Sequence, residues 1–266
     1  MNKKKMIIGI ASVCVVCAIV IGTTLAFLTD SEKVVNTFTV GDFDITLTEP
    51  HWNDGVPDDP KTTDTDESVP GDGSDLTPGS TKIKDPVVTA NINSGYVRVI
   101  VSVIDRNKTI ADPENVGKTI DNPNFGKLVT DKERLDLIMG TLYYDDSYNA
   151  SATPATSKIV PDTKYSKDYL SAFNTFNTKD FTLDTSLSVN GKYYYNKNEI
   201  LEEGQSCVLF TNVAVPQEYT KDMLGKMGSY QIVIQAEGIQ SENFGSAEEA
   251  LAALNEELTK TASGKN

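Results

Sequence analysis

Residues 34–47 read Val-Val-Asn-Thr-Phe-Thr-Val-Gly-Asp-Phe-Asp-Ile-Thr-Leu, with apolar side chains at alternate positions. These side chains stand at even positions before Gly41-Asp42 and at odd positions after it. A period of two predicts a β-strand, because successive strand side chains point to opposite faces, and a change of phase at a glycine predicts a bulge or tight bend. We therefore expect two strands, or one kinked strand. The alternating apolar residues are Phe38, Val40, Phe43, Ile45 and Leu47.

The same pattern recurs further along the chain. Residues 96–104 are apolar on both faces, with valine at each odd position, which predicts a central strand covered on both sides. Arg98 interrupts this run, and we expect it to form an ion pair at the rim of the sheet. Further strands are predicted over 192–196, 205–213 and 229–239.

Two helices are predicted towards the C-terminus. Pro216 can open the first, since proline fits the first turn of a helix, and Gly228 can end it. Ser246 and Glu249 make a capping box for the second, which we expect over about 246–258. Strands outnumber helices, and no parallel strand–helix–strand repeat is visible. We therefore expect an all-β antiparallel sandwich with two or so short helices.

The composition limits the classes of partner. The chain has 266 residues, with 24 Lys and Arg against 38 Asp and Glu, and a formal net charge of −14. An acidic chain without clustered basic residues is unsuited to nucleic-acid phosphates, so no nucleic-acid partner is expected. Residues 49–80 are rich in Pro and Asp, and we interpret them as an acidic insertion within a single domain over 27–266.

The N-terminus has the order of features of a secretory signal. Lys3 to Lys5 precede an uncharged run, and small residues follow before the first acid. We predict that residues 1–26 are a signal peptide, cleaved between Ala26 and Phe27. The chain would then meet the membrane only before cleavage, and the mature protein would be secreted to an extracellular matrix or the cell surface. A retained transmembrane helix is the alternative, because the uncharged stretch is long enough to span a bilayer.

Few residues suit catalysis or metal binding. His51 is the single histidine, so a zinc centre or a Ser-His-Asp triad would have to be built around this one imidazole. We expect it to be a solvated loop side chain beside Trp52. Cys207 is the one cysteine left after cleavage and is expected to be a buried structural thiol, because it lies in a predicted strand. No catalytic residue, metal site or cofactor is predicted, and the chain is not expected to be an enzyme.

Two N-terminal stretches, 22–30 (GTTLAFLTD) and 36–47, resemble the start of the TasA and camelysin family of exported Gram-positive proteins. The resemblance implies a jelly-roll-like β-sandwich, processing by a SipW-type signal peptidase, and assembly into matrix fibres. Some members are described as metalloproteases, an activity that a single imidazole does not support. Later segments match in the same order, over 84–89, 96–99, 193–197, 209–213 and 231–237.

The leading hypothesis is a secreted structural protein of a biofilm or cell-surface matrix, which forms fibres with copies of itself and with a possible accessory matrix protein. An N-terminal strand can pair with its own sheet or with that of a neighbour, and a strand lent head-to-tail makes a contact that does not close. The proposed donor residues are Phe38, Val40, Phe43, Ile45 and Leu47. Two alternatives remain open. One is a monomeric surface module that holds a ligand or cations through the acidic insertion around Trp52 or through the loops, and the other is a camelysin-like secreted protease.

Overall fold

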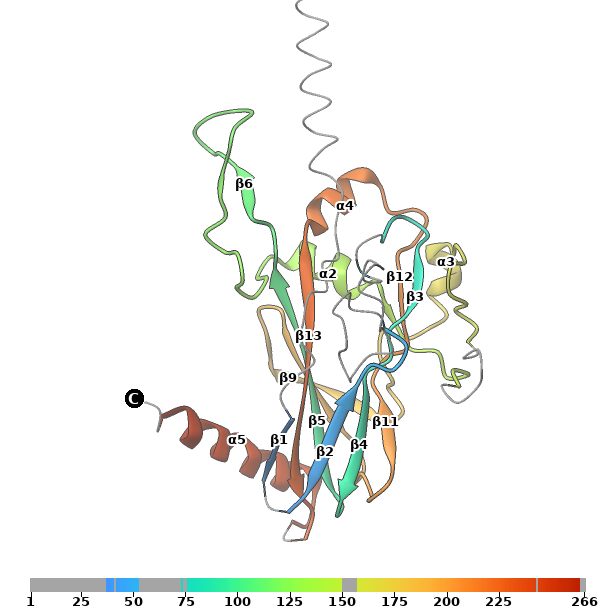
Figure 1. Ribbon diagram of the computed structural model, residues 1–266, viewed down its shortest axis with the longest axis vertical. Coiled ribbons are helices and arrows are strands. Elements are labelled where there is room, and N and C mark those ends of the chain that lie inside the picture. The colour runs from blue at the N-terminus through green and yellow to red at the C-terminus, as the bar shows by residue number, and fades with distance from the viewer. Residues whose placement is uncertain are drawn as a thin grey trace, which may run out of the picture.

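The structure is a computed structural model, and it describes residues 37–40, 42–52, 73, 76–149, 157–242 and 244–263. The chain is mostly β, with an elongated body of strands and a few short helices (Figure 1). Its strand pairs are antiparallel apart from one parallel pair in the described residues. Within these ranges, no helix is both long enough and apolar enough to cross a membrane.

Five strands form the largest sheet: β1 (Thr37–Val40), β5 (Gly95–Asp105), β9 (Phe181–Val189), β10 (Lys192–Lys197) and β13 (Tyr230–Gln240). Their order in space is β1-β13-β5-β10-β9. β5 and β13 pair antiparallel along their full eleven residues. β1 lies at one edge and pairs parallel with the end of β13.

Smaller sheets and helices complete the fold. One sheet contains β11 (Ser206–Val208), β4 (Val87–Ile92) and β2 (Asp44–Thr48). A second contains β3 (Thr81–Ile83), β12 (Asn212–Ala214) and β8 (Leu142–Tyr143). A hairpin pairs β6 (Thr109–Ala111) with β7 (Thr119–Asp121). The helices are α2 (Lys132–Met139), α3 (Lys167–Leu170), α4 (Lys221–Met227) and α5 (Ala247–Ser263).

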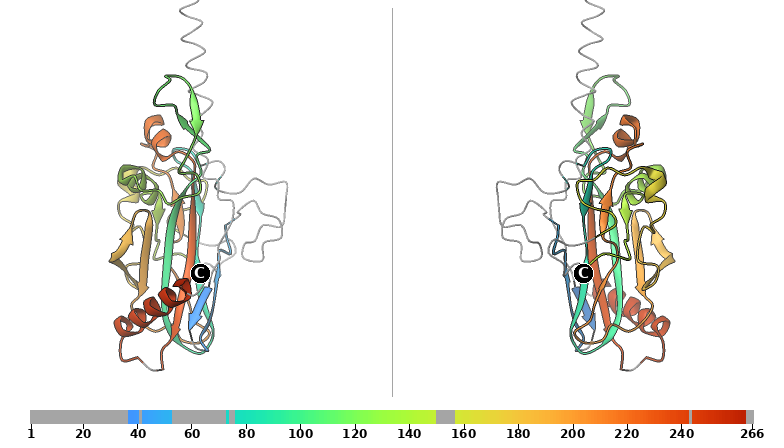
Figure 2. Two further views of the ribbon diagram at one scale, coloured as in Figure 1. Left: turned by 90° about the vertical axis from the view of Figure 1, so that its left-hand side faces the viewer. Right: turned by 90° about the vertical axis from the view of Figure 1, so that its right-hand side faces the viewer.

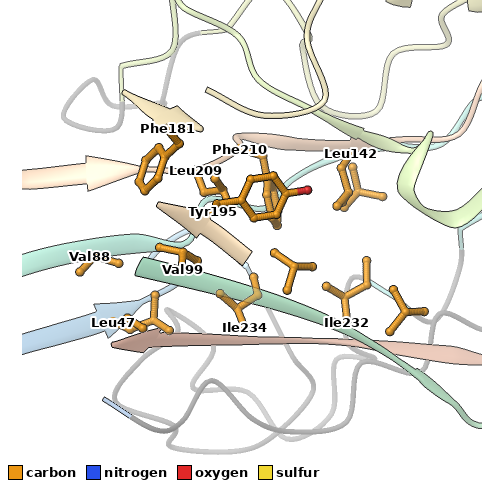
Figure 3. Packing of buried hydrophobic residues seen from close by; sticks show 14 of the residues in the cluster. Leu47, Val88, Val99, Leu142, Phe181, Tyr195, Leu209, Phe210, Ile232 and Ile234 are labelled. Atoms are coloured by element: carbon orange, nitrogen blue, oxygen red, sulfur yellow. The ribbon is translucent and has the colours of Figure 1, made fainter. Parts of the chain in front are cut away.

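One hydrophobic core joins β2 and β4 to the main sheet. The valines at odd positions 97–103 are all buried in it, as the two-sided pattern of this strand predicts. Leu47 and Val88 gather there with Val99 and Ile234 (Figure 3). Along β2, exposed and buried residues alternate, so the predicted period of two is confirmed. β1 ends at Val40 and β2 begins at Asp44. The segment 34–47, in which the apolar pattern changes phase, therefore contains two strands and not one kinked strand.

Two predicted elements differ from those observed. The strand expected over 205–213 is two strands, β11 and β12, which pair in different sheets. The helix expected from Pro216 begins only at Lys221, because the Thr220 side chain caps it by accepting a hydrogen bond from the Met223 amide at 3.2 Å. This helix ends at Gly228, as predicted, where φ is 57°.

Arg98 lies in the interior, and the prediction of a rim position was wrong. Its side chain is 1% exposed and forms the expected ion pair with Glu237 on β13. Its Nη1 also donates to Oδ1 of Asn255 on α5 at 2.6 Å. The apolar side of α5 packs on a cluster that includes Tyr96. The helix, expected over about 246–258, therefore folds back over this face of the sheet and contacts Arg98 through Asn255.

Candidate functional site

β1 is a short strand at the sheet edge, and it lies nearest to the N-terminus of all described strands. Its backbone is in register with Ala236–Ile239, which is four of the eleven residues of β13. The side chains of Phe38 and Val40 lie outside the described part of the chain. For these two residues the structure gives only the backbone pairing with β13. The predicted cleavage site between Ala26 and Phe27 also lies outside the described residues and stays a prediction.

β2 and Phe43, the residue just before it, bury their apolar side chains in the core of their own chain. Phe43, Ile45 and Leu47 are 1%, 1% and 4% exposed, and β2 pairs antiparallel with β4. The ring of Phe43 lies directly on two glycines of the main sheet. A Cβ atom at Gly95 or at Gly238 would stand 2.5 or 2.6 Å from a ring carbon, closer than real contacts allow. Three of the five proposed donor residues therefore fill space inside the chain that carries them.

His51 follows β2 and is held by a buried carboxylate. Its Nδ1 lies 2.8 Å from Oδ2 of Asp85, whose side chain is fully buried, while the imidazole is 30% exposed. The Tyr148 hydroxyl donates to the same Oδ2 at 2.5 Å. Burial, and then the hydrogen bond to Asp85, raise the pKa of Tyr148, so the phenol stays a proton donor. The expectation of a solvated His51 was wrong, because its backbone N–H donates to Oδ1 of Asp85 at 3.2 Å while its ring contacts Oδ2 of the same carboxylate.

A buried ion pair lies beside this group in the sequence. The Nζ of Lys84 is 2.9 Å from Oε1 and 3.1 Å from Oε2 of Glu49, and it stands 4.1 Å from the centre of the Trp52 ring. Lys84 and Trp52 are fully buried, and Glu49 is 4% exposed. The predicted insertion over 49–80 therefore begins with core residues. The Trp52 ring has no exposed surface, so a surface module that binds through the insertion would have to use other residues around it.

The contact between Nδ1 of His51 and Oδ2 of Asp85 orients the imidazole ring. A catalytic metal centre needs about three protein ligands around one ion. Among the described residues, no three His, Cys, Asp or Glu side chains are placed to hold a metal ion. The donor set that the structure describes around His51 thus does not fit a zinc centre.

Cys207 lies in β11, and its side chain is 5% exposed. Burial raises the pKa of this thiol to about 12. The neutral form is the stable one at physiological pH, and a neutral thiol is a poor nucleophile and a poor metal ligand. The prediction of a buried structural thiol is confirmed.

Residues 1–59 match the family model described as camelysin metallo-endopeptidase. The matched region contains the predicted leader, β1, β2 and the His51 segment. The resemblance to the camelysin family, predicted from the N-terminal stretches, is confirmed over these residues. No curated protein matches the chain, and no solved structure matches it. The metal that the family description implies does not fit the described donor set, as given above for His51.

Proposed function

We propose that this protein is an exported structural component of a biofilm or cell-surface matrix, with a jelly-roll-like sandwich that assembles into fibres by exchange of its N-terminal strand. A SipW-type signal peptidase would release the mature chain at Phe27, and an accessory matrix protein would be a further partner. The match of residues 1–59 to the camelysin family supports export, because that region holds the predicted leader together with the first two strands.

The edge position of β1 is the observation that carries the proposal. β1 is the edge strand, and its four residues pair with β13 alone. The same segment of a second copy can make the same backbone hydrogen bonds to β13. Releasing β1 from its own sheet breaks only the pairing of four residues with β13, because β1 is short. β2 is different, since its side chains occupy the core of their own chain. The exchanged segment is therefore the one that ends at Val40, and β2 stays in place.

Two faces of one strand provide the test. The period of two puts Phe38 and Val40 on one face of β1 and Thr37 and Thr39 on the other. We expect the mature chain, residues 27–266, to form filaments in electron micrographs. The variant Phe38→Asp with Val40→Asp should stay monomeric and folded, because two carboxylates on the apolar face of β1 make it costly to bury that face against a second copy.

The matched control is Thr37→Asp with Thr39→Asp, which adds the same charge to the same strand. It should form filaments like the unmodified chain. Equal filament formation by both pairs of variants would rule out this strand as the donor. A mature chain that stays monomeric under all conditions would rule out the fibre function itself.

The family description favours one second candidate, a secreted metallo-endopeptidase. That function requires stoichiometric metal and cleavage of a protein such as casein that a chelator abolishes. We propose that the chain has no such activity and expect the purified mature protein to leave casein intact with and without added zinc. Chelator-sensitive cleavage would establish the alternative.

A further inference from the structure

The hairpin of β6 and β7 projects from the body as an arm, which we define as residues 106–127. It stands beyond α4 at one end of the long axis (Figure 1), and the side views show the same projection (Figure 2). All six residues of its two strands are exposed. A hairpin of two strands is marginally stable in water, because it has no further strand or helix to cover its faces. The arm thus needs either a firm base or a partner.

The base of the arm is held by a polar network. Arg134 on α2 bonds both oxygens of Asp105 at 2.9 and 3.1 Å, and Asp105 accepts a further bond from the Asn122 side chain at 3.1 Å. The Asn122 amide also donates to the Asn107 carbonyl, which ties the two strands of the arm together. Asp105 and Asn122 are both 7% exposed. These bonds fix the direction in which the arm leaves the body.

The outer part of the arm exposes large apolar side chains. Ile110 and Ile120 are cross-strand partners, 36% and 40% exposed, and Val116 at the tip is fully exposed. Phe125, near the base, is 43% exposed. Apolar side chains gathered on a projecting, anchored element mark a contact surface rather than a random exposure. The arm also carries four basic residues against three acidic ones, which are Arg106, Lys108, Lys118 and Lys127 against Asp112, Glu114 and Asp121.

The opposite end of the long axis is an acidic surface. It is formed by residues 42–44, 91–95, 199–205 and 240–242, which hydrogen bonds and strand pairing bring together. This acidic end contains one large exposed apolar residue, Ile92, at 54% exposure. Its sequence has no Lys or Arg, and its acids are Asp42, Asp44, Glu199, Glu202, Glu203 and Glu242.

We propose that the arm of one copy docks on the acidic end of the next copy. The occupant is a second copy of this chain, because the acidic end has acids without bases while the arm offers four bases, three of them lysines, and because the exposed Ile92 can meet the apolar side chains of the arm. The two surfaces also lie at opposite ends of one elongated body (Figure 1). Such a contact joins different surfaces head-to-tail and repeats without closing. It rests on the proposed fibre function and adds a second contact between copies, distinct from the exchange of β1.

Cysteine pairs test the contact directly. Val116→Cys with Ile92→Cys in one chain should give a ladder of disulfide-linked oligomers when its fibres are oxidised. These two positions are at opposite ends, so the bond can form only between copies, and Cys207 is too buried to interfere. The control pairs Ile92→Cys with Val189→Cys, a residue of β9 that is 59% exposed and outside the arm. We expect at least tenfold less ladder from the control.

Charge exchange gives a second, independent readout. Lys108→Glu with Lys118→Glu should lower the fibre yield at least tenfold while the circular dichroism spectrum is unchanged. Adding Glu203→Lys and Glu242→Lys to the same chain should restore it. The arm contact alone would be overturned if fibres form but the Val116→Cys, Ile92→Cys variant gives no more ladder than its control. It would also be overturned if the lysine-to-glutamate changes lower the fibre yield and the added glutamate-to-lysine changes do not restore it. A mature chain that forms no fibres would overturn the proposed function instead.

Discussion

The contact between Phe43 and Gly238 allows the placement of β2 to be measured as a coupling energy. A Cβ atom at Gly238 would lie 2.6 Å from Cε1 and 2.9 Å from Cδ1 of the Phe43 ring. Gly238→Ala therefore forces the ring to move, and such overpacking costs about 1–3 kcal/mol. Phe43→Ala removes a ring that is 1% exposed, and the cavity costs about 3–5 kcal/mol.

The double variant should cost less than the sum of the two single changes. Once the ring is gone, the methyl group at Gly238 enters the space it occupied, so the clash disappears and part of the cavity is filled. We expect a coupling energy of about 1–3 kcal/mol, within the range measured for residues in contact. Urea unfolding of the mature chain gives the four free energies, and the fluorescence of Trp52, the one tryptophan, reports unfolding because its ring is fully buried.

Gly117→Ala is the control partner for the same cycle. Gly117 is at the arm tip with φ +84° and open space around it, so alanine is strained there whatever occupies position 43. This pair should be additive within about 0.3–0.5 kcal/mol. Additivity of Phe43→Ala with Gly238→Ala would refute the placement of the ring, and with it the conclusion that β2 fills its own core.

Three further predictions concern buried polar groups. Lys84→Met should destabilise the chain by about 3–5 kcal/mol in urea unfolding, because Glu49 is left charged and buried without its lysine; full stability in this variant would contradict the ion pair. Cys207 should react with a thiol reagent only after urea is added, since its pKa is raised to about 12; rapid modification of the folded chain would show it exposed. Burial raises the pKa of Asp105, but hydrogen bonds from Arg134, Asn107 and Asn122 outweigh it and leave the pKa below 3.8. The stabilisation by the charged Asp105 is therefore complete above pH 3.8 and is lost as the pH falls below it. The free energy of unfolding of Asp105→Asn, measured against pH, should lack this loss. A pH dependence equal to that of the unmodified chain would contradict the lowered pKa.

Local patterns predicted the parts of the fold that depend on neighbouring residues. Phe43, Ile45 and Leu47 alternate with polar residues, and the structure buries all three on one face. Both faces of β5 are apolar in the sequence, which predicted a covered strand, and its valines are buried. Ser246 begins the last helix, where its hydroxyl accepts a hydrogen bond from the Glu249 amide at 3.3 Å. In each case a short-range rule was enough, because the residues that decide the element lie within it.

Contacts between distant segments could not be predicted in this way. The carboxylate that orients His51 is 34 residues away, and the phenol that shares it is 97 residues away. No spacing rule relates such positions, so a lone histidine in a Pro-rich stretch suggested a solvated side chain. The same limit explains Trp52, which follows a strand and buries against Lys84. The Arg98 ion pair was predicted, but its depth depends on α5, which folds back from the far end of the chain.

Strand exchange between copies is tested most directly by fibres grown from a mixture of chains labelled either with ¹⁵N alone or with ¹³C alone. In such fibres, solid-state NMR transfer from ¹⁵N to ¹³C reports only contacts between different copies. We expect signals between residues 37–40 and residues 236–239, the partners of β1 in β13. Signals between these residues that occur only in fibres of doubly labelled chains would place β1 in its own sheet and contradict assembly by this strand.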